Sequence, residues 1–172
     1  ASGPAFSAGH DLREIRANPD PGFHERLFAQ CSDLMVQITR LRQPVIAQVG
    51  GVATAAGCQL VATCDLAVAG ASARFATPGV NIGLFCSTPM VALSRNVAPK
   101  HAMEMLLTGD VVGARQAEAI GLINQAVPAN ELGEVVASVA MKIASKSMVT
   151  VKTGKQAFYR QLDLPLDEAY AY

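Results

Sequence analysis

The stretch PVIAQVGGVATAAGCQLVATCD, from Pro44 to Asp65, decides the fold of this chain. It opens with an apolar, partly β-branched run at 45–49, which predicts a buried strand. Gly50-Gly51 break the run, and the small residues at 52–57 allow backbone to approach backbone or a ligand closely. Residues 57–64 are nearly all apolar and predict a short buried helix. The free amide N–H groups at the start of such a helix can hold an anion or an oxyanion.

The glycines of this stretch do not match two common phosphate-binding patterns. The spacing from Gly50-Gly51 to Gly57 is not GxGxxG, and no Gly-Lys-Ser/Thr follows, so neither a dinucleotide fingerprint nor a P-loop fits. On this stretch alone, a tightly packed strand-to-helix corner explains the glycines more simply than a binding site does.

Composition narrows the class of protein. The chain has 172 residues, which suggests one domain, and 51% of them are hydrophobic. Lys and Arg together number 14, as do Asp and Glu, and no basic run occurs, so nucleic acid is not the expected partner. No apolar run approaches the roughly 20 residues of a membrane helix. The cysteines form no CxxC pair and predict reduced, buried thiols and no metal site; they are Cys31, Cys58, Cys64 and Cys86. These features indicate a soluble intracellular protein.

Hydrophobic periodicity and turn residues divide the rest of the chain into short elements. The patterns predict strands at 1–6, 66–69, 74–77 and 124–127, and a loop at 78–83. They predict helices at 10–16, 23–41, from about 89, at 99–107, at 113–121, from 128 to about 147, and around 151–159. Strands that alternate with helices early, followed by helices alone, indicate an α/β core with a helical C-terminal part.

Several motifs in this order resemble the enoyl-CoA hydratase/isomerase (crotonase) family. They are FSAGHDL at 6–12, the Pro44–Asp65 stretch, FATP at 75–78, MLLTG at 105–109 and ARQA at 114–117. The resemblance implies a spiral core of ββα turns at 1–128 and the start of a helical oligomerisation region at 129–172. It also implies that the chain is truncated at both ends and that the protein is a homotrimer or a dimer of trimers.

The resemblance further implies an oxyanion hole made of two backbone N–H groups, those of His10 and Ala56. In such a site the amides hold the carbonyl oxygen of an acyl-CoA thioester, where negative charge develops during the reaction. The expected partner is therefore an acyl-CoA, with coenzyme A as part of the substrate and no other cofactor required. The residues expected to contact it are Ala8, His10, Asp11, Leu12, Arg13 and Ala56.

Gln59 and Gly79 stand at the positions of the two glutamates that hydratases of the family carry. A carboxamide cannot take up a proton near neutral pH, and glycine has no side chain. No Asp or Glu occurs between Asp65 and Glu104, so the adjoining loop supplies no substitute. Each acid or base typically contributes about a hundred- to ten-thousandfold to the rate, so we expect a weak or altered hydratase. Restoring both carboxylates is expected to raise activity if the pocket has room.

Other side chains have a functional and a simpler structural interpretation. Thr77, Asn81 and Cys86 fall where the family has its acyl pocket; the alternatives are loop caps for the first two and a small buried hydrophobe for the third. Arg13 can meet a CoA phosphate or be a solvated helix residue. The ring of His10 can line the pocket or simply pack at the surface.

Three functions are consistent with these residues. The first is an enzyme acting on acyl-CoA thioesters, the second a non-catalytic thioester-binding modulator of lipid metabolism, and the third a structural subunit. The missing glutamates favour a non-catalytic thioester-binding modulator over ordinary hydration. The retained turns of the predicted oxyanion hole favour an enzyme or a modulator over a structural subunit. The expected location is the cytoplasm in a bacterium and the mitochondrial matrix in a eukaryote.

Overall fold

The computed structural model describes residues 3–172, so the first two residues of the strand predicted at 1–6 lie outside the described residues. Strands and helices alternate as expected for an α/β protein. The strands are β1 (Ala5–Ser7), β2 (Ile46–Val49), β3 (Val52–Thr54), β4 (Leu66–Gly70), β5 (Arg74–Ala76), β6 (Val112–Gly113) and β7 (Gln125–Val127). The helices are α1 (Leu12–Ala17), α2 (Pro21–Arg40), α3 (Ala56–Thr63), the 3₁₀ helix η1 (Pro78–Ile82), α4 (Ser87–Asn96), α5 (Pro99–Thr108), α6 (Ala114–Ala119), α7 (Leu132–Ala144), α8 (Met148–Gln161) and α9 (Leu166–Ala171).

The described strands form two sheets, and Gly50-Gly51 carry the chain from one sheet to the other. Strand β2 belongs to a parallel sheet of order β2-β4-β7, whereas β3 belongs to a sheet of order β1-β3-β5-β6. A side chain at Gly51 would collide with the carbonyl oxygen of Pro4, so the crossing requires a residue without a Cβ. Two strands in different sheets followed by helix α3 make one ββα turn of the spiral that the sequence implied.

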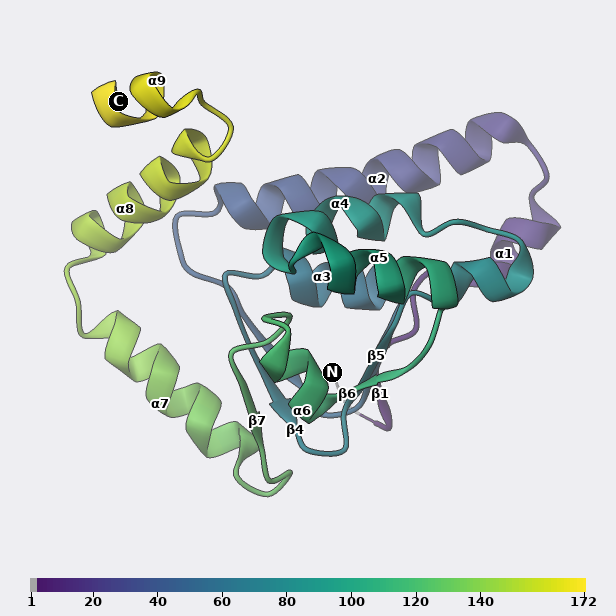
Figure 1. The fold of residues 1–172 in the computed structure, drawn as a ribbon, viewed down its shortest axis with the longest axis horizontal. Helices are drawn as coiled ribbons and strands as arrows, with labels where there is room; N and C mark the ends of the chain where they lie inside the picture. Colours follow the sequence, from purple (N-terminus) through teal and green to yellow (C-terminus); the bar gives the residue numbers. More distant parts are fainter. Residues whose placement is uncertain (1–2) are drawn as a thin grey trace.

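Helix α3 lies at the centre of the packing because it is apolar on nearly all its faces. Figure 1 shows α2, α3, α4 and α5 together on one side of the strands. Fully burying a large apolar side chain contributes about 1.5–3 kcal/mol, so this core is the main source of stability. The largest fully buried apolar side chains are Phe75, Leu93, Leu106, Val49, Val61 and Val68.

The structure corrects several predicted elements. The loop predicted at 78–83 contains the 3₁₀ helix η1, which ends at Gly83 in a left-handed conformation. Strands β3 and β6 were not predicted, because two or three residues are too few to show an alternating pattern. The helix predicted from about 89 begins two residues earlier, at Ser87. Helix α9 was also missed.

The C-terminal helices follow β7 and extend along one edge of the molecule. In Figure 1, α7 runs upward beside the sheets, and α8 and α9 continue beyond the end of α2. Helix α7 contacts β2 and β4. These helices match the predicted helical C-terminal part, while the domain boundary at 128 stays a prediction.

Candidate functional site

The two turns predicted to hold an oxyanion lie next to each other. Strands β1 and β3 are parallel neighbours, with Ser7 paired to Ala53, so the residues that follow them meet at the same sheet edge. The hydroxyl of Thr54 donates a hydrogen bond to the carbonyl of Ala8 at 3.3 Å. A Cβ on Gly9 would lie 3.2 Å from the amide nitrogen of Ala56. The sequence-predicted pair, the turns of His10 and Ala56, is therefore brought together.

The backbone of Ala55 positions the N–H of Ala56. Ala55 has φ 51° and ψ −120°, and it is the only non-glycine residue with positive φ among the described residues. Its own N–H donates to the carbonyl of Ala76 at 3.0 Å, which fixes this turn to β5. Ala56 is the first residue of α3, and no side chain caps that helix. Within residues 3–172, neither the amide of His10 nor that of Ala56 donates to a backbone acceptor, and the first amides of a helix lack intrahelical partners.

Replacing Ala55 with glycine is expected to stabilise the fold. A side chain held at positive φ costs roughly 1–3 kcal/mol, part of which the greater flexibility of glycine in the unfolded chain offsets. We expect the free energy of unfolding to rise by about 1 kcal/mol, measured by urea titration. Ala8→Gly, in the neighbouring turn, is the matched control and should give no gain. An unchanged or lower stability of Ala55→Gly would show that this turn is unstrained.

The side chain of His10 packs against helix α2. Its ring meets the ring of Phe28 edge-to-face, with centroids 5.2 Å apart. The neighbouring Asp11 caps α1, and its carboxylate accepts a hydrogen bond from the N–H of Arg13 at 2.8 Å. Leu12 and Arg13 are exposed, so their predicted contacts with coenzyme A remain predictions. The ring of His10 thus has a packing partner, and its backbone N–H is the group left for the site.

Gln59 is buried one helical turn after Ala56, with 4% of its surface exposed. Its backbone is satisfied, because its N–H donates to the carbonyl of Ala55 at 3.0 Å and its carbonyl accepts from the hydroxyl of Thr63 at 2.7 Å. Its side-chain Oε1, by contrast, is the only buried side-chain nitrogen or oxygen without a hydrogen-bond partner in the described part of the chain. Native folds contain few such atoms, and each calls for an explanation.

Gly79 lies in η1, and the structure leaves no room for a side chain there. A Cβ on Gly79 would lie 2.6 Å from the carbonyl oxygen of Leu84 and 2.8 Å from the Sγ of Cys86. The condition on the expected gain in activity, room in the pocket, is therefore not met at this position, and the gain itself stays a prediction. A glutamate at Gly79 would push the following loop away, because a backbone carbonyl cannot yield as the end of a flexible side chain can.

The three predicted acyl-pocket residues have different surroundings. Thr77 is fully buried and its hydroxyl donates to the carbonyl of Met105 at 2.9 Å, so it links η1 to α5 and is not the loop cap that the simpler interpretation expected. Asn81 is exposed. Cys86 is buried, as expected for a small hydrophobe, and approaches Gly79. The structure thus brings Gly79 and Cys86 together, whereas the hydroxyl of Thr77 is hydrogen-bonded to α5.

Burial makes the thiol of Cys58 hard to ionise. Its pKa rises from the ordinary value of 9.0 to about 12, first because of burial and then because of the neighbouring Cys86, while a hydrogen bond with the backbone of Ala76 acts in the opposite direction. The pKa of Cys64 also rises, to about 11, mainly through burial. Neither thiol is therefore an activated nucleophile.

These raised pKa values predict that the fold loses stability in alkali. The folded state holds the proton of Cys58 more tightly than the unfolded state, so its contribution is complete below about pH 9 and decreases as the pH rises toward about 12. Denaturant titrations at increasing pH should show the free energy of unfolding falling across this range. Cys58→Ala should reduce the slope. A free energy of unfolding independent of pH above 9 would contradict the assignment.

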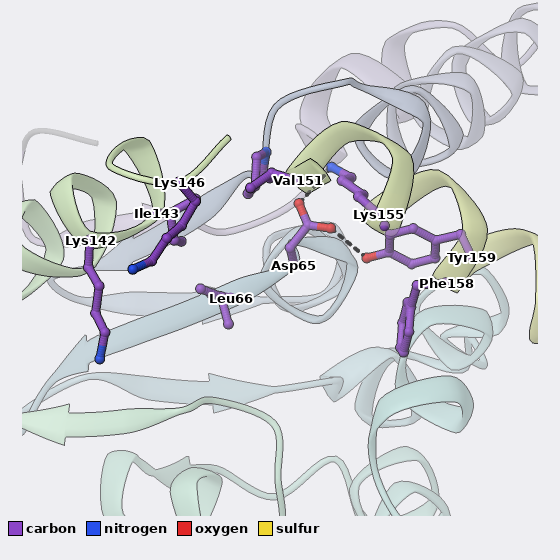
Figure 2. A pocket seen from close by; sticks show the side chains of 11 residues that line it. Asp65, Leu66, Lys142, Ile143, Lys146, Val151, Lys155, Phe158 and Tyr159 are labelled. Carbon is purple, nitrogen blue, oxygen red and sulfur yellow. Dashed lines mark hydrogen bonds and ion pairs between the residues drawn. The ribbon is translucent and has the colours of Figure 1, made fainter. Parts of the chain in front are cut away.

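Asp65 forms a buried polar cluster with residues of α8, shown in Figure 2. Its carboxylate accepts hydrogen bonds from the N–H of Val45 at 2.6 Å, from the Nζ of Lys155 at 2.6 Å and from the hydroxyl of Tyr159 at 2.9 Å. Burial and the bond to Asp65 raise the pKa of Tyr159. These contacts give Asp65 a structural role. The sequence analysis did not single out Lys155, because a lysine on a helix is usually solvated.

A cavity of about 510 Å³ adjoins this cluster and lies apart from the predicted oxyanion turns. Mostly apolar side chains of α7 and α8 line it, together with Leu66 at the start of β4. Lys142 of α7 and Lys146, which follows the end of α7, lie at its side in Figure 2. Residues 3–172 contain no group of His, Cys, Asp and Glu that could hold a metal ion, and none of their helices is long and apolar enough to cross a membrane.

Two sheets connected as a ββα spiral, with the turns of His10 and Ala56 adjacent at one sheet edge, define the crotonase class of fold. The chain belongs to the enoyl-CoA hydratase/isomerase family, whose model matches residues 1–172. This confirms the family and the fold class that the sequence motifs indicated.

Known relatives agree with this assignment. The chain is 51% identical over 170 residues to the mitochondrial enoyl-CoA hydratase domain-containing protein 3 of Rattus norvegicus. The alignment covers 99% of this chain and 57% of the rat protein. The crystal structure of an enoyl-CoA hydratase from Mycobacterium smegmatis matches with a TM-score of 0.97 and 55% identity, over 99% of this chain and 66% of that one. The crystal structure of human enoyl-CoA hydratase domain-containing protein 3 matches with a TM-score of 0.95 and 51% identity, over 99% of this chain and 67% of that one. The chain thus spans little more than half the length of the rat relative.

Proposed function

We propose that this protein binds acyl-CoA thioesters and holds the thioester oxygen with the backbone N–H groups of His10 and Ala56. The observation that carries the proposal is the meeting of two turns whose amides have no backbone acceptor among the described residues. A carbonyl oxygen that receives two fixed amide hydrogen bonds is polarised, and such donors contribute about a hundred- to a thousandfold each to reactions that place charge on that oxygen. Coenzyme A takes part only as a portion of the ligand.

We further propose that hydration of an enoyl thioester is slow at this site. Water addition needs a base for the water and an acid at the α-carbon. Gln59 offers an amide, and the space beside Gly79 is filled by Leu84 and Cys86. Thioester chemistry that needs only a stabilised oxyanion, such as decarboxylation, remains compatible with the site, as does binding without turnover in a modulator of lipid metabolism.

Exposed apolar side chains on the C-terminal helices and at their ends support the proposal of a homotrimer or a dimer of trimers. Free apolar surface of this extent is typical of subunit interfaces. The exposed side chains are Met141, Met148, Val149, Phe158, Leu162, Leu166, Tyr170 and Tyr172. The rat relative is named as mitochondrial, and the Mycobacterium smegmatis relative is bacterial, so we propose the mitochondrial matrix or the cytoplasm according to the source.

Calorimetric titration of the full-length protein with acetoacetyl-CoA and with free coenzyme A tests the binding proposal. Acetoacetyl-CoA is expected to bind at least about tenfold more tightly, because only the thioester has an oxygen for the two amides. Turnover of crotonyl-CoA should stay below about 1 s⁻¹, under the range typical of enzymes. Equal affinities, or no binding, would refute the oxyanion hole. Turnover at ordinary enzymatic rates would refute the role given to Gln59 and Gly79.

A further inference from the structure

The cavity of about 510 Å³ beside α8 is kept open in part by a glycine. Gly154 lies in the interior of α8 and lines this cavity, and a Cβ on it would meet no atom within 4 Å. Glycine lowers helix stability relative to alanine, and here no close contact requires it. Val151, on the same helix face, and Leu66 of β4 also line the cavity, and both are half-buried. The volume falls within the range of about 300–1,000 Å³ that is typical of small-molecule sites.

The charged residues that line the cavity leave two cations without a partner. Asp65 is the one acidic residue among them, and Lys155 holds its carboxylate at 2.6 Å. The ammonium group of Lys155 has three protons, and its other two bonds go to backbone carbonyls, so it has none left for a ligand. Lys142 and Lys146 form no ion pair within residues 3–172. In Figure 2 both lie on the side of the cavity opposite Tyr159. The cavity is therefore apolar with an excess of positive charge on one side.

A ligand that suits this cavity has an apolar body and one anionic end. Leu66, Ile143 and Val151 offer apolar side chains, and covering them with an alkyl chain is favourable in proportion to the area removed from water. Lys142 and Lys146 attract a negative charge as two separate point charges. No arginine lines the cavity to bind a phosphate at two points, so a singly charged carboxylate is the better match.

We propose that this cavity binds a medium-chain fatty acid, with its alkyl chain in the apolar part of the cavity and its carboxylate beside Lys142 and Lys146. The residues that line the cavity include none from the two turns of the proposed thioester site, so this binding does not depend on thioester binding. The bound ligand contacts both α7 and α8 and stabilises the folded state by mass action.

Calorimetric titration of the full-length protein with decanoate, decanol and decyl phosphate tests the charge preference. Decanoate is expected to bind with a Kd below about 1 mM and at least about threefold more tightly than decanol, because ion pairs with exposed lysines are modest. The preference should shrink in about 1 M salt, which screens charges beyond roughly 3 Å. Lys142→Gln combined with Lys146→Gln should abolish the preference. Lys100→Gln makes the same change at an exposed residue of α5 and should leave it intact.

Gly154→Leu tests the location, because its side chain would fill the cavity. Decanoate is expected to bind at least about tenfold more weakly, since each methylene that loses its apolar contact costs up to about fourfold in affinity. The variant should melt at or above the temperature of the unmodified protein, because the new side chain begins in open space and leucine favours a helix. Gly133→Leu makes the same change in α7, at a residue with equally open surroundings that does not line the cavity, and should leave the affinity unchanged.

The outcomes separate this inference from the proposed function. Undiminished decanoate affinity in Gly154→Leu, or displacement of decanoate by acetoacetyl-CoA, would overturn the assignment to this cavity. Equal affinity for decanol would overturn the role of the two lysines, and tighter binding of decyl phosphate would overturn the carboxylate. No binding of decanoate by the unmodified protein would overturn the proposal as a whole. Failure of acetoacetyl-CoA alone to bind would refute only the thioester site, because the two sites share no residue.

Discussion

Replacing Lys155 with methionine is expected to lower the free energy of unfolding by about 3–5 kcal/mol, because it leaves the buried carboxylate of Asp65 without its cation. The side chains of Lys155 and Asp65 are only 6% and 15% exposed. The ammonium group also donates to the carbonyls of Ile38 and Gln43, each at 3.0 Å, and so ties α8 to the end of α2. One substitution therefore removes an ion pair and two further hydrogen bonds.

Denaturant titration of Lys155→Met measures this loss. Lys146→Met is the matched control, since Lys146 is exposed and its replacement should change stability by less than about 0.5 kcal/mol. A loss below about 1 kcal/mol for Lys155→Met would place the pair among ordinary surface ion pairs and contradict its assigned role. The expected loss belongs to the cluster around Asp65 and is independent of the thioester site.

Gly57→Ala is expected to destabilise the fold by about 3 kcal/mol, the upper part of the range for overpacking, and to abolish thioester binding. A Cβ on Gly57 would collide with the carbonyl oxygen of Ser7 and also meet the Cβ of Ser7 at 2.8 Å. Because Ser7 ends β1 and Gly57 is the second residue of α3, the added methyl group would push apart the two turns that carry the His10 and Ala56 amides.

Thermal unfolding and acetoacetyl-CoA binding test this prediction together. Gly133→Ala is the control, because its Cβ would meet no atom within 4 Å and its helix should gain up to about 1 kcal/mol. If Gly57→Ala kept both the stability and the affinity of the unmodified protein, the close approach of β1 to α3 would not be what holds the two turns together.

The sequence predicted the elements that have a strong pattern. The helix expected at 23–41 and the strand and helix of the Pro44–Asp65 stretch were placed within about two residues of α2, β2 and α3. A long amphipathic repeat and a sharp glycine break are local signals, so they can be recognised without knowing the tertiary structure. Strands β3 and β6 were missed because their existence depends on neighbouring strands far away in the sequence.

The site was predictable in part. Family motifs located the turns of His10 and Ala56, and the structure places them side by side. The lack of space beside Gly79 could not be predicted, since it arises from the carbonyl of Leu84 and the thiol of Cys86 folding back on η1. The unpaired oxygen of Gln59 and the partners of Lys155 likewise depend on packing between distant elements.

The most direct test of the proposed oxyanion hole is infrared spectroscopy of butyryl-CoA labelled with ¹³C at the thioester carbonyl. Two backbone hydrogen bonds weaken the carbonyl double bond, so the labelled band is expected to move to lower wavenumber when the ligand binds the full-length protein. With Gly57→Ala, which is expected not to bind the thioester, the labelled band should stay at its position in water. A bound ligand whose carbonyl band stays at its position in water would contradict the account, because the oxygen would then lie away from the amides of His10 and Ala56.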